Sequence, residues 1–339
     1  MKLVTGAGGF IGSNLVAALE ATGDEIAVCD WLDVPAKMKN LENRRIAESI
    51  RPDGLLEFMH DRAGEIETVF HMGAISSTTE TNVALITEMN VTLPIQIWTW
   101  CRDHEVPLVY ASSAATYGDG ALGFDDDDTV AALQQLQPLN PYGRSKNEFD
   151  IWVAEQVAAG AGEPPQWVGL KFFNVYGPNE YHKGGQMSVV PQVFEQISGT
   201  GRARLFQSHH PDYEDGGQLR DFVWVGDCVE VMLWLEARPS VSGVFNCGTG
   251  RARSFLDLAK AVFQAFGKDV VIDYVPTPEP IRDKYQYFTE ANMVKLTAAG
   301  YDRPFTSLED GVGRYVSDYL MAEDAYLQAG DPNGHGILS

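Results

Sequence analysis

The sequence predicts an α/β protein with a Rossmann-like, doubly wound parallel sheet and a smaller α/β lobe. Three observations support this fold class. Apolar strand patterns alternate with helical patterns through residue 173, a glycine-rich turn opens the first helix, and the chain becomes polar and loop-rich from Asn174. Such alternation is typical of a parallel sheet with helices on both faces. We therefore expect a first domain of residues 1–173 with about 221–247, a second lobe of residues 174–220 with about 248–327, and a tail of residues 328–339.

The composition limits the partners that the protein can have. Its 339 residues include 25 Lys and Arg against 47 Asp and Glu, a formal charge of −22. This charge disfavours nucleic acid or an anionic membrane as a partner, although local Arg and Lys residues can still hold a small phosphate ligand. Neither an apolar run of membrane-spanning length nor a signal-peptide pattern is present. We expect a cytoplasmic protein without a membrane partner.

The cysteines and the acidic run give no metal pattern. Cys29, Cys101, Cys228 and Cys247 are scattered, and we interpret them as reduced core residues. The acidic run of residues 125–128 is interpreted as a solvated loop, because the sequence places no further metal ligand near it. We expect no metal site.

A glycine turn follows the first predicted strand, residues 2–5. Gly6, Gly9 and Gly12 allow a tight turn, a close approach of a pyrophosphate to the backbone, and close packing of helix on strand. The helix that begins with Phe10 and Ile11 directs its N-terminus toward the phosphate charge. The position of the triplet between a strand and a helix predicts dinucleotide binding.

The second strand, residues 25–29, ends in Asp30 and Trp31. An acid at this position usually binds ribose hydroxyls, as in NAD sites. Lys37 and further basic residues follow closely and could meet the 2′-phosphate of NADP. These residues leave NAD and NADP both open.

The next two strands, residues 67–71 and 107–111, lead toward the same edge of the predicted sheet. Asn90 lies either inside a helix or in a position that braces a loop, and the second is favoured. Ser113 places a hydroxyl where ligands bind in parallel sheets, with a turn-capping serine as the alternative. The small loop residues Gly73, Ala74, Ser76 and Ser77 would let a cofactor pass over the first of these strands, and Met72 and Ile75 of the same loop are expected to join the cofactor contacts.

Tyr142 and Lys146 lie four residues apart on a predicted helix that extends to about Val157, so they share one face. An ammonium group there can lower the pKa of the phenol. A tyrosine base at pH 7 needs its pKa lowered by roughly 3 units, or about 4 kcal/mol, more than one lysine supplies. A cationic cofactor ring could supply the remainder. The alternative is an incidental surface pair, but the glycine turn and Ser113 meet Tyr142 at one sheet edge, which favours redox chemistry.

Further elements complete the prediction. A buried fifth strand is expected at residues 167–173, and strands at 221–225 and 244–247, joined by a helix, are expected to return to the first domain. Residues 187–197 form a predicted helix. Ser254 with Asp257, and Thr306 with Glu309, have the spacing of helix capping boxes, and the last helix is expected to reach about Tyr326.

The motifs TGAGGFIG, SSAATYG, YGRSK and FFNVYGP together resemble the extended short-chain dehydrogenase/reductase superfamily. HMGAISSTTE, NEYHKG and KYQYFTEAN narrow the resemblance to the ADP-L-glycero-D-manno-heptose 6-epimerase family, over about residues 1–320. The resemblance implies an isomerase that interconverts ADP-D-glycero- and ADP-L-glycero-β-D-manno-heptose, which are precursors of the lipopolysaccharide inner core. It implies transient oxidation at C6″ with bound NADP, and a homo-oligomer, since family members form rings of five.

The same resemblance assigns roles to residues. Ser113, Tyr142 and Lys146 form a catalytic triad, and Lys183 is a second base, with diphosphate binding as its alternative. Lys37 favours NADP, and Val175 joins the cofactor contacts. The implied substrate contacts are Ser113, Asn174, Lys183, Gly185, Gln192, Phe206, Gln207, Ser208, Arg220 and Tyr285. For Arg220, a surface salt bridge with Asp221 is the alternative.

Two departures from the family pattern bear on the substrate contacts. Residues 209–219 form an apparent acidic insertion, interpreted as a surface loop or lid, and Gln192 stands where some members carry histidine. Another NAD(P)-dependent nucleotide-sugar epimerase, similar to UDP-glucose 4-epimerase, is the alternative function. A dehydratase is disfavoured because residues 114–116 lack an acidic pair, and a non-catalytic dinucleotide sensor because Tyr142 and Lys146 are both present.

Overall fold

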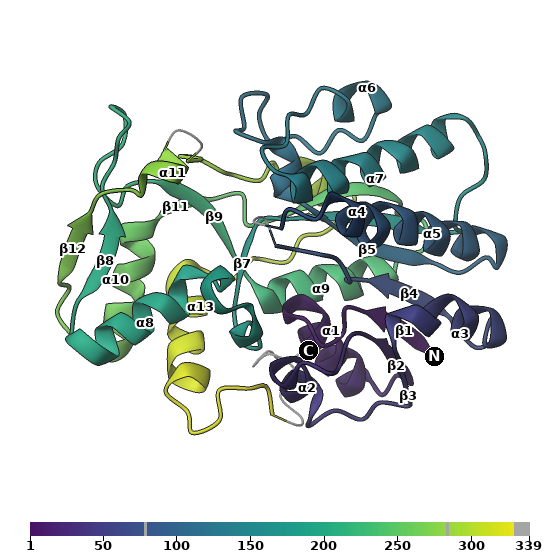
Figure 1. The fold of residues 1–339 in the computed structure, drawn as a ribbon, viewed down its shortest axis with the longest axis horizontal. Helices are drawn as coiled ribbons and strands as arrows, with labels where there is room; N and C mark the ends of the chain where they lie inside the picture. Colours follow the sequence, from purple (N-terminus) through teal and green to yellow (C-terminus); the bar gives the residue numbers. More distant parts are fainter. Residues whose placement is uncertain (78–79, 283–284, 329–339) are drawn as a thin grey trace.

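The computed structural model describes residues 1–77, 80–282 and 285–328 and divides into two lobes (Figure 1). The larger lobe is built on a seven-stranded sheet in the order β10-β6-β5-β4-β1-β2-β3, with every neighbouring pair parallel. Its strands are β1 (Lys2–Thr5), β2 (Ile26–Cys29), β3 (Glu48–Ile50), β4 (Thr68–His71), β5 (Leu108–Ser113), β6 (Trp167–Phe172) and β10 (Gly243–Cys247). The Rossmann-like prediction is confirmed, and the strand order reverses at β1, where a cleft opens in such sheets.

Strand β3 was not predicted. It has three residues, pairs only with β2 at the sheet edge, and none of its residues is fully buried. A short, half-exposed edge strand carries neither an apolar run nor a clear alternation, so the sequence gives little signal for it.

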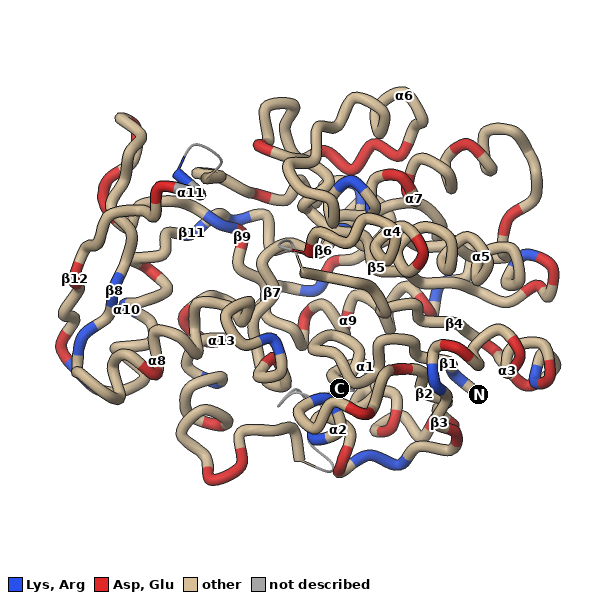
Figure 2. The backbone as a smooth tube through the Cα atoms, viewed as in Figure 1, with Lys and Arg blue, Asp and Glu red and all other residues tan. Residues whose placement is uncertain are grey.

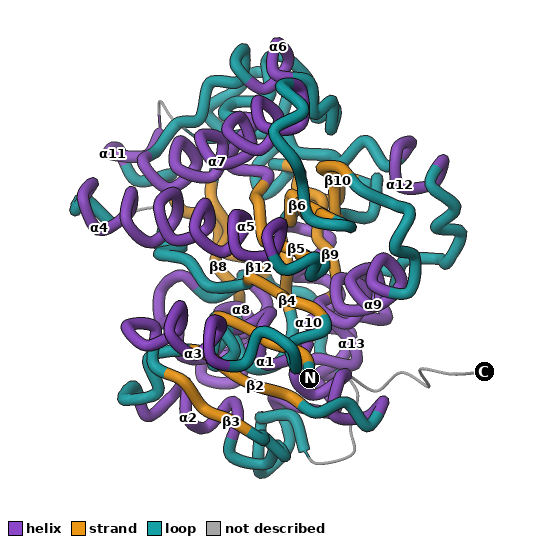
Figure 3. Tube along the Cα trace, turned by 90° about the vertical axis from the view of Figure 1, so that its right-hand side faces the viewer, coloured by secondary structure: helices purple, strands orange, loops and turns teal. Residues whose placement is uncertain are grey.

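Helices cover both faces of this sheet (Figure 3). Alternate strand residues face opposite sides, so Val4 packs with α1 and α9 while Leu3 packs with α3, α5 and α7. The helical segments of this lobe are α1 (Phe10–Thr22), α2 (Pro35–Leu41), η1 (Pro52–Gly54), α3 (Leu55–Asp61), α4 (Val83–Thr87), η2 (Glu88–Thr92), α5 (Leu93–Asp103), η3 (Ala114–Tyr117), α6 (Val130–Leu133), α7 (Pro141–Ala158), α9 (Val225–Glu236) and α12 (Val294–Ala298).

The second lobe holds two small sheets. Strands β7 (Asn174–Tyr176), β9 (Leu219–Trp224) and β11 (Ala252–Ser254) form one, and β8 (Ala203–Phe206) and β12 (Ile272–Val275) form the other. Its apolar core lies between these strands and helices α8, α10 and α13. Acidic residues are spread over both lobes (Figure 2). The helical segments are η4 (Tyr181–Gln186), α8 (Val189–Thr200), α10 (Phe255–Phe266), α11 (Glu279–Arg282), α13 (Leu308–Arg314) and η5 (Tyr315–Leu320).

Three predictions about these elements need correction. The strand expected at residues 221–225 exists, but it pairs with β7 and β11 rather than in the large sheet, which only β10 rejoins. The second capping box is shifted by one residue: Ser307 caps α13 through the Asp310 amide, while the Thr306 side chain binds Asp227. The helical segment after α13 ends at Leu320, earlier than expected.

The acidic run is a solvated loop only in part, because Asp125 and Asp127 are exposed whereas Asp126 and Asp128 are not. The carboxylate of Asp126 is buried and accepts the backbone N–H of Asn246 at 2.8 Å, and Asp128 accepts that of Val244 at 2.9 Å. Both amides belong to β10, the edge strand of the large sheet. Two carboxylates two residues apart therefore bind alternate amides of an edge strand that would otherwise be open to another chain.

All four cysteines are buried and free, as expected. Within the described ranges, no helix has the length and apolarity needed to cross a membrane. The same residues contain no group of three or more His, Cys, Asp or Glu side chains arranged to hold a metal ion.

Candidate active site

A cleft of about 740 Å³ opens at the carboxyl ends of the large sheet. The terminal residues of five strands line it: Thr5, Cys29, His71, Ser113 and Phe172. The second lobe closes its other side through β7, η4 and the start of α10. The cleft therefore lies where the fold class predicts a ligand.

The glycine turn forms the floor of this cleft. Gly6 has φ +66°, and a Cβ added there would lie 2.6 Å from the Gly73 Cα; a Cβ on Gly12 would lie 2.2 Å from the Gly6 carbonyl oxygen. Gly9 is the N-cap of α1 and has no capping side chain, so backbone N–H groups are presented at this helix end. Phe10 and Ile11 line the cleft beside it. A cradle that excludes side chains beside a helix N-terminus fits a pyrophosphate.

Asp30 and Lys37 form an ion pair at the end of β2. The Lys37 ammonium lies 2.8 Å from Asp30 Oδ1, and the carboxylate also accepts the backbone N–H groups of Trp31 and Gly8. Asp30, Trp31 and Lys37 all line the cleft. Gly8 is a residue that the glycine-triplet pattern missed, and it ties the glycine turn to Asp30 at the end of β2.

Asn90 connects the loop of residues 72–76 to helix α7. It lies within the π-helical segment η2, and its side-chain amide exchanges hydrogen bonds with the backbone of Ile75 at 2.8 and 3.0 Å. It also donates to Ser145 Oγ at 3.0 Å. Asn90 is thus inside a helix and braces a loop at once, so the two readings of this residue are compatible. The braced segment of residues 72–76 lines the cleft.

The sequence positions Ser113 and Tyr142 through two local devices. Ser113 ends β5 and caps the short helix η3 by accepting the Ala115 N–H at 3.1 Å, so the capping role also holds. Helix α7 begins with Asn140 as N-cap, which accepts the Gly143 N–H at 2.8 Å. A Cβ on Gly143 would lie 2.6 Å from the Ala115 carbonyl oxygen, so this glycine lets α7 approach η3 closely enough for the Tyr142 phenol to hydrogen-bond Ser113.

The electrostatics of the pair differ from the prediction in one respect. Burial raises the pKa of Tyr142, with the Ser113 hydrogen bond opposing and Asp150 adding to the rise. Burial lowers the pKa of Lys146 to about 8, and its ammonium donates to the Ala111 carbonyl oxygen at 2.7 Å. The Lys146 ammonium is directed to a backbone carbonyl, and it does not lower the pKa of the Tyr142 phenol as the sequence had suggested.

His71 is a cleft residue that sequence reasoning missed. It ends β4 and is buried, and its Nδ1 lies 2.7 Å from Thr5 Oγ1. Burial and the nearby Lys146 charge lower the pKa of His71 to about 3, so its ring is neutral. His71 could have been found from the sequence, because it ends a predicted strand in the block HMGAIS and the carboxyl ends of the strands line the cleft.

Lys183 enters the cleft from the second lobe, on η4. Its ammonium lies 5.2 Å from the centre of the Phe10 ring, and burial lowers its pKa while Glu180 opposes. The buried Glu180 fixes this segment, because its carboxylate accepts Ser188 Oγ at 2.7 Å and Tyr315 Oη at 3.1 Å. Asn174, Val175 and the missed residues His182, Gln186 and Met187 also line the cleft.

Arg220 is a buried cation next to aromatic rings. Its guanidinium lies 5.5 Å from the rings of both Phe255 and Tyr285 and donates to the carbonyl oxygens of Leu219 and Gln286. Asp221 is its neighbour in β9 and therefore faces the other side, where it binds Thr249 and the Gly250 amide. The alternative of a salt bridge with Asp221 is not supported.

The structure brings some predicted substrate residues together and leaves others apart. Phe206 contacts Tyr285 edge to face at 6.2 Å, and Phe255 links this cluster to the cleft that it also lines. The Gln192 side chain turns back to the Met187 carbonyl oxygen at 2.9 Å. The predicted contacts that do not line the cleft are Gly185, Gln192, Phe206, Gln207, Ser208, Arg220 and Tyr285.

The insertion before Arg220 packs onto the same aromatic cluster. His210 and Tyr213 lie 5.1 Å from Tyr287 between ring centres, and Tyr287 contacts Tyr285 at 5.4 Å. The insertion is thus a surface segment anchored by rings beside Arg220.

Comparison with known proteins defines the class. Residues 2–248 match the model of the NAD dependent epimerase/dehydratase family, and the chain belongs to that family.

Within the family, the chain is similar to epimerases that act on different substrates. It is 48% identical, over 96% of its length and 100% of the relative, to an ADP-L-glycero-D-manno-heptose-6-epimerase of Nitratidesulfovibrio vulgaris. A Helicobacter pylori ADP-L-glycero-D-manno-heptose-6-epimerase structure is similar with TM-score 0.76 and 25% identity, covering 94% of this chain and 95% of that one. A Thermus thermophilus UDP-glucose 4-epimerase structure in complex with NAD is similar with TM-score 0.69 and 26% identity, covering 92% and 97% of the two chains.

Proposed function

We propose that this protein is an ADP-glyceromanno-heptose 6-epimerase, an isomerase that interconverts ADP-D-glycero- and ADP-L-glycero-β-D-manno-heptose. The observation that carries the proposal is the similarity over the full length of a relative of that activity, together with a cleft that joins the glycine turn to Ser113, Tyr142 and Lys146. The sequence-based interpretation pointed to the same reaction. The product serves the synthesis of the lipopolysaccharide inner core.

The glycine turn, the segment of residues 72–76 and the Asp30–Lys37 pair would hold a nicotinamide dinucleotide, which supplies the hydride acceptor and donor. NADP is the proposed form, because the Lys37 ammonium lies beside the position of the adenosine ribose and can bind a phosphate. Asp30 is already neutralised by Lys37, which makes an added anion less unfavourable there.

Tyr142 is the proposed base on one side of the sugar, with Ser113 hydrogen-bonded to the Tyr142 phenol and Lys146 fixing the geometry through its hydrogen bond to the Ala111 carbonyl oxygen. Epimerisation needs hydride returned to the opposite face of the oxidised carbon, which requires either a substrate that turns in the cleft or a second proton donor across the cleft. Lys183 approaches from the other lobe, and burial favours its neutral amine, which suits an acid–base role. Diphosphate binding remains its alternative role.

Arg220, flanked by Phe255 and Tyr285, is the proposed site for the diphosphate of the substrate. A guanidinium presents paired donors to phosphoryl oxygens. Arg220 is buried without an ion pair to any described acid, so a bound anion would supply the missing counter-charge. Phe206 and residues 207–208 continue from this cluster and would receive the adenosine. Residues 1–173 with 221–247 would then bind the cofactor, and the remaining described segments would bind the nucleotide sugar.

The test is incubation of the protein with ADP-D-glycero-β-D-manno-heptose while the C6″ configuration is followed by NMR. Inversion to a mixture of the two epimers is expected, without added cofactor if the protein retains it. UDP-galactose serves as the matched control substrate. Turnover of UDP-galactose with no inversion of ADP-heptose would instead favour the UDP-glucose 4-epimerase-like alternative.

Replacement of Lys183 by methionine tests the second base. Cofactor binding should persist while epimerisation falls by about a hundredfold or more, because general acid–base catalysis commonly contributes ~10²–10⁴-fold. Unchanged turnover would remove Lys183 from the mechanism and leave it a binding role.

Two coarser expectations complete the proposal. We expect the reaction to take place in the cytoplasm, where four buried thiols would stay reduced. A homo-oligomer is expected from the family resemblance.

A further inference from the structure

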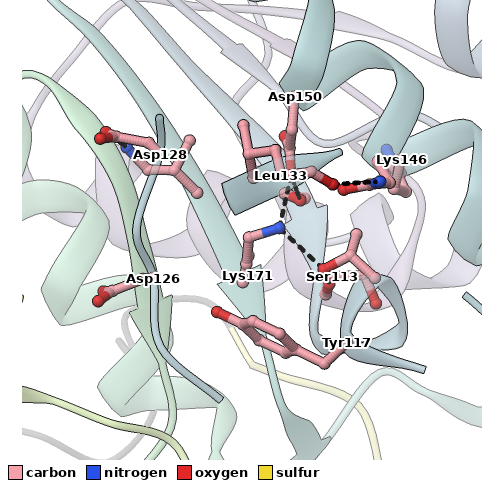
Figure 4. A network of polar contacts seen from close by, with 12 residues as sticks. Ser113, Tyr117, Asp126, Asp128, Leu133, Lys146, Asp150 and Lys171 are labelled. Carbon is pink, nitrogen blue, oxygen red and sulfur yellow. Dashed lines mark hydrogen bonds and ion pairs between the residues drawn. The ribbon is translucent and has the colours of Figure 1, made fainter. Parts of the chain in front are cut away.

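A buried ion pair lies directly behind the catalytic residues (Figure 4). Lys171 of β6 and Asp150 of α7 are 2.7 Å apart, and their side chains are 1% and 0% exposed. Two charges removed from water to this degree carry a desolvation cost of several kcal/mol each. A protein with apolar residues of similar size in place of a buried ion pair is often equally stable, so we look for a role of this pair other than stabilising the fold.

The Asp150 carboxylate ties α7 to the strand that ends in the catalytic serine. Oδ2 accepts Ser112 Oγ at 2.6 Å as well as the Lys171 ammonium, and Oδ1 accepts Tyr110 Oη at 3.2 Å. Tyr110 and Ser112 are two residues apart in β5 and therefore share the face that meets α7. Ser113 directly follows Ser112 in β5, so Asp150 holds the strand up to the residue before Ser113.

The Lys171 ammonium holds the turn on the other side of Ser113. It donates to Thr116 Oγ1 at 2.8 Å and lies 5.2 Å from the centre of the Tyr117 ring. Thr116 Oγ1 in turn donates to the Ser113 carbonyl oxygen at 2.9 Å. Lys171 and Asp150 thus fix the backbone of Ser113 from both directions along the chain.

The same pair faces the catalytic lysine. Asp150 lies one helical turn after Lys146 on α7, and Lys146 binds the carbonyl of Ala111, the residue between the two β5 contacts of Asp150. The titratable groups around the Lys146 ammonium are Asp150 and Tyr142 on α7 and His71 on β4. Among them, Asp150 is the group that raises the pKa of Lys146.

We propose that the Asp150–Lys171 ion pair is a positioning element of the active site. The pair sets the distance between helix α7, which carries Tyr142 and Lys146, and the Ser113 turn, by which we mean Ser113 with η3. Asp150 also supplies the negative charge that balances Lys146. Neither residue lines the cleft, so both act through other groups. The inference rests on the proposed function for its kinetic consequence, whereas its electrostatic consequence holds for any substrate.

The main test replaces both charges at once, in Asp150→Leu/Lys171→Met, which avoids leaving one charge buried alone. Cofactor affinity and substrate KM should stay within about threefold of wild type, while kcat falls by about 10- to 100-fold, the loss expected when reacting groups are displaced by about 1 Å. A matched control is Lys2→Met/Glu236→Leu, which removes a half-buried ion pair at the start of β1, at the end of the large sheet that faces away from the cleft. The control should keep wild-type kcat.

A second readout follows the Lys146 amine itself, by NMR of the protein after reductive methylation with ¹³C, with Lys146→Ala identifying the signal. Loss of the Asp150 carboxylate should lower the pKa of Lys146 in the double variant and not in the control. This measurement decides the inference even if ADP-heptose proves not to be the substrate, which would overturn the proposed function alone.

Thr116→Val keeps the ion pair but cuts its link to the Ser113 turn, and so serves if the double variant does not fold. Its kcat should fall about tenfold, and Thr116→Ser should restore it. The proposal is overturned by a folded double variant with wild-type kcat and an unchanged Lys146 pKa, or by a Thr116→Val enzyme as active as wild type.

Discussion

Lys146 should make the folded protein less stable at neutral pH than a methionine in its place would. Burial lowers the pKa of Lys146 to about 8 from an ordinary 10.5. At 1.36 kcal/mol per pKa unit, this corresponds to about 3 kcal/mol of destabilisation at pH 7. The side chain is 3% exposed, so solvent screening reduces the figure little.

The sign of the pH dependence follows from linkage. Between pH 8 and 10.5 the unfolded chain binds this proton and the folded chain does not, so rising pH favours the folded state. The destabilisation that Lys146 causes is at its full value below pH 8 and falls below about 1 kcal/mol by pH 10. Contributions from all other groups cancel when the wild type is compared with Lys146→Met.

The assay is chemical denaturation of both proteins at pH 7, 8, 9 and 10. From pH 7 to pH 10, the free energy of unfolding of the wild type should rise by about 2 to 3 kcal/mol relative to that of Lys146→Met. The lost hydrogen bond to Ala111 adds a term that changes little with pH until the lysine titrates. A difference that stays constant from pH 7 to pH 10 would show that burial does not depress the pKa of Lys146.

Three further predictions concern binding. Gly12→Ala should abolish cofactor binding, measured by fluorescence titration, because its Cβ would lie 2.2 Å from the Gly6 carbonyl oxygen; Gly64→Ala, with open space around it, should bind normally. Lys37→Ala should weaken NADP by about tenfold while NAD changes little, since a hydrogen bond to a charged group contributes roughly 1.5 kcal/mol or more; equal losses for both cofactors would contradict a 2′-phosphate contact. Arg220→Met should raise the KM for the nucleotide sugar by roughly 10- to 100-fold with kcat within a few fold, and an unchanged KM would remove Arg220 from the diphosphate site.

The features predicted well from the sequence are those with local causes. The glycine turn works through residues three apart on the chain, and Tyr142 and Lys146 share a face because a helix repeats every 3.6 residues. Strand ends follow from apolar runs, so Ser113 and Asp30 were placed at the correct edge of the sheet. Capping at Ser254 was also predicted, because the box is contained within four residues.

The features that were missed depend on contacts between distant residues. Asp126 binds an amide 120 positions later, so its run of four acids gave no sign of a buried, structural role. The Lys171–Asp150 pair joins a strand to a helix, and neither residue stands out in the sequence. Thr306 and Ser307 are both good caps, and only the contact of Thr306 with Asp227 decides between them.

We propose that the configuration at C6″ inverts by removal and return of the same hydrogen within one cleft. It is tested most directly by running the reaction in D₂O and examining C6″ of both epimers by NMR and mass spectrometry. The redox route predicts inverted product in which C6″ carries its original hydrogen, because the hydride leaves to the cofactor and returns from it. Deuterium at C6″ would instead indicate exchange of a proton with solvent and would contradict the redox route.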